Sequence, residues 1–137
     1  MTEIEEALKE NYKSAWGIAH AEIGDEMDEI SEFIANGDIE GRYTALLVFE
    51  EEYVNIAKYA YPDKEEGGPV FIKVSSLDNG MEMVFIDAGI PFDPTDPELL
   101  KVDMEKIGGH GIEIIIKYSK EVEYERRSDM NFLRLLV

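Results

Sequence analysis

The sequence predicts an α+β fold on three observations. Asn79-Gly80, a dipeptide typical of tight hairpin turns, joins two β-rich segments, residues 70–76 and 81–86. The chain ends in two more strand-like segments, turned at Ser128-Asp129. Between residues 25 and 61, apolar side chains recur at the spacing of amphipathic helices. Hairpin strands in one part of a chain and helices in another are typical of α+β domains.

Two amphipathic helices are expected in the first half of the chain. One begins at Asp25 and ends at Asn36-Gly37, with apolar residues on one side and acidic residues on the other. The other covers residues 41–61. Its core stripe consists of Leu46, Phe49, Tyr53, Ile56 and Ala60. A short helix over residues 1–13 and a strand over residues 15–22 are expected before them.

The second half is expected to hold the loops and the closing strands. Residues 91–103 are rich in proline and aspartate and predict a loop that could act as a lid, with one helical turn near residues 98–101. A helix is expected over residues 112–118. The closing strands are expected at residues 121–126 and 132–137.

The composition restricts the classes of function. With 31 acidic and 13 basic residues among 137, the formal net charge is -18, which repels nucleic acid and anionic lipid. No apolar run approaches the ~20 residues that span a bilayer, and the acidic N-terminus lacks a secretory signal pattern. The absence of cysteine excludes disulfides, thiolate metal sites and thiol nucleophiles. We therefore expect a cytoplasmic protein that binds neither nucleic acid nor membrane directly.

Asp87 is the first candidate binding residue. It follows the apolar residues 83–86, so it lies where a buried strand ends and a loop begins. A carboxylate there can accept hydrogen bonds from a ligand amine, and Gly89 lets the backbone come close to a flat ring. The alternative is an acid in an ordinary turn, because Asp and Gly are common turn residues for local reasons.

Glu51 and Asn55 are the next candidates. They lie one turn apart on the second face of the helix over residues 41–61, together with Leu47 and Val54. An Asn beside apolar neighbours in a helix suggests the wall of a pocket, although a plain surface Asn is an equally good interpretation. At about 100° per residue, the neighbours of Glu51 in the acidic run 50–52 are expected to point away from Asn55.

A glycine-rich loop supplies a candidate phosphate site. Gly108, Gly109 and Gly111 precede the helix over residues 112–118. Glycines at the start of a helix present free backbone N–H groups and the positive end of the helix dipole, which bind phosphate oxygens. A flexible connector is the alternative interpretation.

The order of these motifs carries a resemblance to a known family. In chain order they are Glu51-x-x-x-Asn55, Asp87-x-Gly89 followed by Pro91-Phe92-Asp93, and Gly108-Gly109-x-Gly111. They resemble the N, G1 and G2 boxes of the GHKL ATPases, and residues 15–137 look like the small anti-sigma-factor serine kinases. The resemblance implies a two-layer α/β sandwich of the Bergerat type, with a mixed, mostly antiparallel sheet and helices on one face. It also implies one domain over residues 14–137, preceded by a helical extension over residues 1–13.

The resemblance also implies roles for single residues. Asn55 would bind Mg²⁺, Glu51 would be the general base, Asp87 would accept the adenine amino group, and Gly89 would admit the base. The phosphates of ATP would be held by Lys106, Gly108, Gly109, His110 and Gly111.

Two positions depart from the family pattern. His110 stands where relatives carry an aliphatic residue, and Arg134 stands where many relatives carry a Thr beside the adenine-binding Asp.

The resemblance implies a serine kinase that binds a sigma factor and phosphorylates an antagonist of the anti-anti-sigma type. The cofactors would be ATP and Mg²⁺, and the protein would form a homodimer. The alternative is a nucleotide-gated binding module without phosphotransfer. A histidine kinase is disfavoured because residues 1–13 are too short for a phospho-accepting hairpin, and gyrase-like or chaperone ATPases need further domains.

Overall fold

The computed structural model describes residues 16–20, 31–32, 34–35, 41–63, 68–99, 101 and 110–137, of which residues 16–20 are described as backbone only. The helix expected over residues 1–13, and most of the one expected from Asp25 to Asn36, lie outside these residues. Residues 31, 32, 34 and 35 are helical, in agreement with the second of these predictions.

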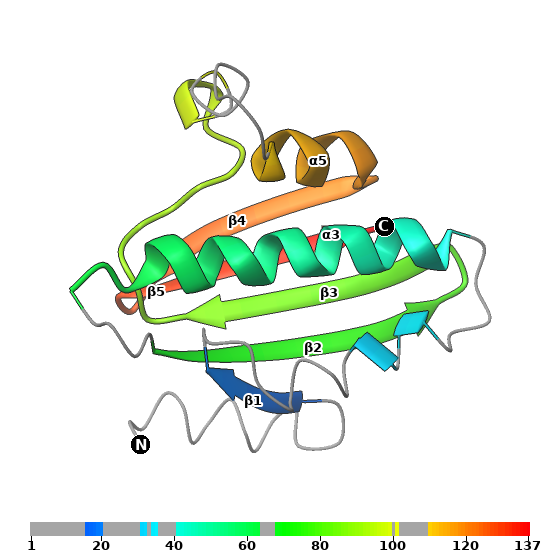
Figure 1. The fold of residues 1–137 in the computed structure, drawn as a ribbon, viewed down its shortest axis with the longest axis horizontal. Helices are drawn as coiled ribbons and strands as arrows, with labels where there is room; N and C mark the ends of the chain where they lie inside the picture. The colour runs from blue at the N-terminus through cyan, green and yellow to red at the C-terminus, as the bar shows by residue number, and fades with distance from the viewer. Residues whose placement is uncertain are drawn as a thin grey trace.

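The described residues form one five-stranded sheet (Figure 1). Its strands are β1 Trp16–His20, β2 Pro69–Leu77, β3 Gly80–Asp87, β4 Glu121–Arg127 and β5 Met130–Leu136. Their order is β1-β2-β3-β5-β4, and all four neighbouring pairs of strands run antiparallel. The strand expected over residues 15–22 and both predicted hairpins are confirmed.

Helices cover one face of this sheet. α3 (Arg42–Asn55) continues into a turn of π-helix, η1 (Ile56–Ala60), and α5 (Gly111–Tyr118) packs beside α3. Figure 1 shows α3 running along the length of β3. Because the helices lie on one face of the sheet, the predicted α+β sandwich is confirmed.

No helix within the described ranges is long and apolar enough to cross a membrane.

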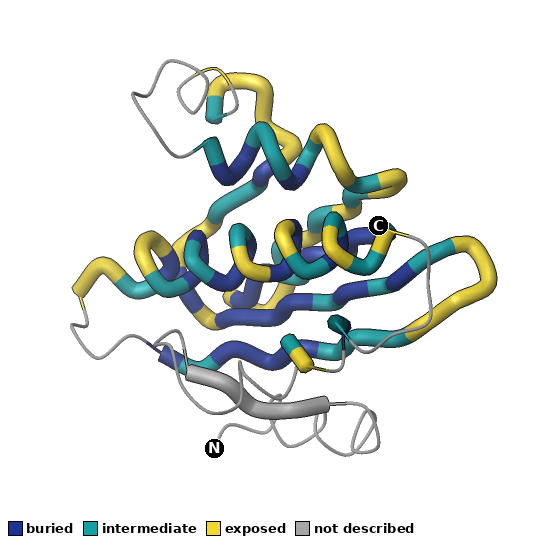
Figure 2. Tube along the Cα trace, turned by 45° about the vertical axis from the view of Figure 1, so that its right-hand side comes forward, coloured by how far each residue is buried: buried dark blue, intermediate teal, exposed yellow. Residues whose placement is uncertain are grey.

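The main core lies between the helices and the sheet. Phe49 and Tyr53 of α3 are buried there, and the ring of Phe49 stacks on Phe85 of β3 at a centroid distance of 5.9 Å. Figure 2 shows buried residues following both α3 and the central strands. A smaller cluster on the opposite face contains Phe71 and Ile86. Successive side chains of a strand point to opposite faces of the sheet, so alternate residues of a strand join the main core and the smaller cluster.

The hairpin turns fix which residues pair across the sheet. Ser128 and Asp129 have φ angles of 53° and 60°, the left-handed pair that suits a two-residue turn between β4 and β5. The separate pairing of β3 with β5, which no hairpin turn joins, places Asp87, the last residue of β3, directly opposite Asn131 of β5. This pairing positions the candidate site.

Candidate functional site

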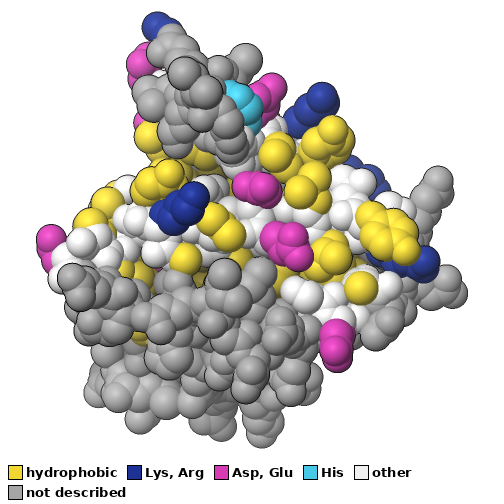
Figure 3. All heavy atoms as spheres, viewed as in Figure 1, with side chains coloured by type: hydrophobic (Ala, Val, Ile, Leu, Met, Phe, Trp, Pro, Cys, Tyr) yellow, Lys and Arg dark blue, Asp and Glu magenta, His cyan; other side chains and the backbone are white. Residues whose placement is uncertain are grey.

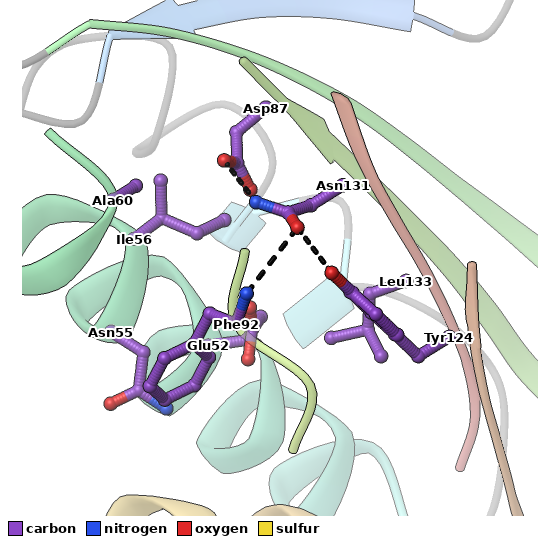
Figure 4. A pocket seen from close by; sticks show the side chains of 9 residues that line it. All are labelled: Glu52, Asn55, Ile56, Ala60, Asp87, Phe92, Tyr124, Asn131 and Leu133. Carbon is purple, nitrogen blue, oxygen red and sulfur yellow. Dashed lines mark hydrogen bonds between the residues drawn. The ribbon is translucent and has the colours of Figure 1, made fainter. Parts of the chain in front are cut away.

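A small cavity lies where the end of β3 approaches the second half of α3. Its volume is about 10 Å³, roughly the space of one water molecule. Helix, sheet and the loop after β3 all contribute side chains to its walls (Figure 4). The lining residues are Glu52, Asn55, Ile56, Ala60, Asp87, Phe92, Tyr124, Asn131 and Leu133.

Asp87 is buried at the sheet side of the cavity, with 6% of its surface exposed. Its Oδ1 accepts hydrogen bonds from the backbone N–H of Gly89 and from Nδ2 of Asn131, both at 2.9 Å. Within the described part of the chain both bonds end on Oδ1, which leaves Oδ2 as an acceptor for a ligand. Burial raises the pKa of Asp87, while Asn131, Gly89 and the charge of Arg126 act in the opposite direction.

Asn131 holds Asp87 and the following loop together. Besides Asp87, its Nδ2 donates to the backbone oxygen of Ile90 at 2.8 Å. Its Oδ1 accepts from the hydroxyl of Tyr124 at 2.5 Å and from the backbone N–H of Phe92 at 3.4 Å. Asn131 therefore fixes the orientation of the Asp87 carboxyl group, a role that the motifs in the sequence did not indicate.

The prediction that Arg134 stands beside Asp87 was wrong. Arg134 pairs with Val84 in the sheet and points to the face opposite the helices. There its guanidinium donates to the carboxylates of Glu82 and Glu121, each at 2.8 Å. Arg134 therefore belongs to a surface ion-pair network, and Asn131 occupies the place beside Asp87.

Gly89 lies against the end of η1. The backbone N–H of Ile90 donates to the oxygen of Ala60 at 2.9 Å, which draws the two segments together. A Cβ on Gly89 would come within 2.3 Å of that same oxygen. The close approach explains why this position is glycine, while its role in admitting a base stays a prediction.

Glu51 and Asn55 meet the start of α5. A Cβ on Gly111, the first residue of α5, would lie 2.8 Å from Oε2 of Glu51 and 3.4 Å from Oδ1 of Asn55. The structure thus brings together three predicted site residues from two distant parts of the chain.

Of the remaining predicted phosphate residues, His110 precedes α5, and its Nδ1 is 3.9 Å from Oε2 of Glu113. Lys106, Gly108 and Gly109 lie outside the described residues.

Glu52 points into the cavity, contrary to the expectation that both neighbours of Glu51 point away from Asn55. That expectation holds for Glu50, which is exposed. Glu52 follows the buried residues Val48 and Phe49 at helical spacing, so it lies on the face of α3 that packs on the sheet. The same spacing could have located it from the sequence.

Glu52 is 4% exposed. Among the described residues, neither its Oε2 nor Nδ2 of Asn55 has a hydrogen-bond partner. Burial and the charge of Asp87 raise the pKa of Glu52 well above its usual value, while the Asn55 amide lowers it. The cavity thus holds two carboxyl groups and an amide with unused hydrogen-bonding capacity.

Comparison with known proteins gives one family. A model described as a histidine kinase-like ATPase domain matches residues 15–137. No curated protein matches the chain.

Proposed function

The chain belongs to the family of histidine kinase-like ATPase domains, and we propose that it is a cytoplasmic, Mg²⁺-ATP-dependent serine kinase. In this proposal it acts as an anti-sigma factor, which binds a sigma factor and phosphorylates an antagonist of the anti-anti-sigma type. The observation that carries the kinase proposal is the meeting of Glu51, Asn55 and Gly111, because it joins a carboxylate, a metal-binding amide and a helix start.

The cavity fits an adenine ring once it opens. Ile56, Ala60 and Leu133 offer apolar walls for a flat ring, and Oδ2 of Asp87 offers an acceptor at the end of the cavity. The amino group of adenine donates to such an acceptor, whereas guanine places a carbonyl oxygen at the same position. With guanine, Oδ2 of Asp87 and the carbonyl oxygen would face each other without a hydrogen between them, which costs about 1 to 3 kcal/mol. ATP is therefore favoured over GTP.

Asn55 is the proposed protein ligand of Mg²⁺. Its Nδ2 is buried without a described partner, and its Oδ1 faces Gly111, where phosphates would enter. The described residues contain no group of three carboxylate or imidazole side chains that could hold a metal alone. Mg²⁺ prefers a few protein oxygens together with phosphate oxygens and water, so a single amide oxygen beside a phosphate site suits it.

The first turn of α5 is the proposed phosphate site, and Glu51 is the proposed general base. Backbone N–H groups at a helix start bind phosphate oxygens. Glu51 lies close to that start and remains partly accessible, so a serine hydroxyl could reach it. Glu51 would take the proton of that hydroxyl as the serine oxygen bonds to the terminal phosphorus of ATP. The bond between that phosphorus and the bridging oxygen breaks at the same time, and ADP leaves with the electron pair.

Label transfer tests this proposal. The protein is incubated with γ-labelled ATP, Mg²⁺ and a candidate antagonist, and phosphoserine is then measured. Glu51→Gln should slow transfer by about 100- to 10,000-fold with unchanged ATP affinity, the usual range for a positioned base. Glu50→Gln, which alters an exposed neighbour, is the matched control and should transfer at the wild-type rate. Equal rates in both variants would exclude Glu51 as the base.

A nucleotide-gated binding module is the second candidate, and the closed cavity favours it. The ring of Phe92 lines the cavity and stacks on Tyr59 at 6.1 Å with an interplanar angle of 8°. A nucleotide base must therefore move the loop that carries Phe92, and such a movement could control partner binding. Nucleotide-dependent partner binding without any label transfer would support this candidate over the kinase.

Exposed apolar side chains on the helical face support the partner part of the proposal. Tyr43 is 72% exposed, and Leu47 and Tyr118 are also exposed. Figure 3 shows apolar side chains intermixed with both acidic and basic ones on this face. Such a mixed surface suits a protein partner that contributes apolar and charged groups. We also propose a homodimer, which sedimentation of the purified protein would reveal.

A further inference from the structure

We propose that Glu52 is a specificity-determining residue, whose Oε2 accepts a hydrogen bond from the second N–H of the base amino group while Asp87 accepts the first. The inference rests on the proposed binding of ATP in the cavity. It adds a base contact on the helix side of the cavity to the one on the sheet side.

The first observation is the position of Glu52. It extends from α3, while Asp87 extends from the end of β3, and both line a cavity of only about 10 Å³ (Figure 4). The charge of Asp87 raises the pKa of Glu52, so the two carboxyl groups are close enough to interact. Helix and sheet thus each present an acidic side chain to the same space.

The second observation is the unused acceptor. Glu52 is 4% exposed, and its Oε2 has no hydrogen-bond partner among the described residues. None of the nine side chains that line the cavity is a cation. A buried acceptor destabilises the folded protein unless a water molecule or a ligand supplies the missing donor, and a ligand that fills the cavity takes the place of such a water.

The chemistry of the missing donor follows from the two acceptors. Oδ2 of Asp87 and Oε2 of Glu52 together require a group with two hydrogens on one small atom. A primary amino group on a flat ring meets that requirement, because its two N–H bonds diverge in the ring plane. The carboxyl group of Glu52 has an acceptor oxygen in both its protonated and its charged form.

A base with a primary amino group at this position therefore satisfies both carboxyl groups. A base with a carbonyl oxygen there donates to neither Oδ2 of Asp87 nor Oε2 of Glu52, and only a protonated Glu52 could donate to that oxygen. Glu52 thus strengthens the preference for the amino purine that Asp87 begins.

A protein–ligand double-mutant cycle tests the inference. The dissociation constants of ATP and of purine riboside triphosphate, which lacks the amino group, are measured for wild type, Glu52→Met and Glu52→Gln. Wild type should lose about 10- to 100-fold in affinity when the amino group is absent. In Glu52→Met this loss should shrink about 5-fold or more, because one of the two acceptors is gone. Glu52→Gln retains an amide oxygen and should restore the larger loss.

The controls separate base recognition from structure. Glu50→Met alters an exposed acid two residues before Glu52, about 200° away around the helix, and should keep the wild-type ratio of the two affinities. Unfolding midpoints without nucleotide should be equal to or above wild type in both Glu52 variants, because each removes a buried carboxyl group.

Two results would overturn the inference. If Glu52→Met weakens ATP and purine riboside triphosphate equally, Glu52 has only a structural role. If wild type binds both nucleotides equally, no amino contact exists at either acidic residue. A wild type that binds neither nucleotide contradicts the proposed function itself, which distinguishes the two failures.

Discussion

Replacing Asp87 with asparagine should weaken adenine nucleotide binding without unfolding the protein. Oδ1 of Asp87 accepts from Gly89 and Asn131 at 2.9 Å each, and the amide oxygen of asparagine can take over both bonds. The new NH₂ group then replaces Oδ2, so a donor faces the amino group of the base where an acceptor stood. The variant therefore changes one contact and keeps the hydrogen bonds that fix the loop.

The expected loss follows from that mismatch. A buried donor left opposite another donor costs about 1 to 3 kcal/mol, which corresponds to about 5- to 150-fold in the dissociation constant. Calorimetric titration with Mg²⁺-ATP measures the affinity, and urea unfolding measures the stability. Stability should stay near wild type, since burial already disfavours the charged form of Asp87.

Two results would refute the reasoning about Asp87. Unchanged affinity for ATP would mean that Oδ2 does not contact the base. A large loss of stability in Asp87→Asn would mean that the carboxylate is needed for the fold. Asn131→Asp is the companion variant. It places a second carboxyl group beside Asp87 and removes Nδ2 of Asn131, which donates a hydrogen bond to Oδ1 of Asp87.

Three further variants test single features. Asn55→Ala should abolish the metal-dependent part of nucleotide binding, measured with and without EDTA, and metal-independent binding by wild type would contradict its role. Glu52→Gln should exceed wild type in stability by up to about 1 to 3 kcal/mol near neutral pH, with the difference vanishing near the unfolded pKa of about 4.5. Because the pKa of Glu52 is raised in the folded state, wild type loses stability as pH rises above the unfolded pKa. Glutamine does not titrate, so the stability difference between the two proteins should grow with pH. A difference that does not change with pH would contradict the raised pKa of Glu52. Gly89→Ala should destabilise by about 1 to 3 kcal/mol in urea unfolding, because the new Cβ would collide with the oxygen of Ala60, and an unchanged unfolding midpoint would contradict this.

Much of the fold was accessible from local sequence signals. Ser128 and Asp129 form the turn between β4 and β5 with left-handed backbone angles, as predicted. The turn between β2 and β3 consists of Asp78 and Asn79, one residue before the predicted pair, so both hairpins were predicted within a few residues. The helix over residues 41–61 was predicted as a whole. Its last part is the π-helical turn η1, whose Ala60 oxygen accepts from Ile90 in the loop after β3. That contact joins distant parts of the chain, and helix periodicity contains no sign of it.

The candidate site was accessible only in part. Residue types and order identified Glu51, Asn55 and Asp87, which the structure brings to one end of α3. Asn131 was missed because its position beside Asp87 depends on the register between β3 and β5, which the sequence motif alone does not determine. Glu52 was missed because the predicted core stripe of α3 left out Val48, the buried residue one helical turn before it.

The most direct test of the account compares the stabilisation of the protein by Mg²⁺-ATP and by Mg²⁺-GTP in thermal unfolding. A ligand that binds only the folded state raises the melting temperature, and at a given concentration it does so more when its affinity is higher. The account predicts a clear increase with Mg²⁺-ATP and Mg²⁺-ADP, and a far smaller one with Mg²⁺-GTP at the same concentration. Equal increases with ATP and GTP, or no increase with either, would contradict an adenine site built around Asp87.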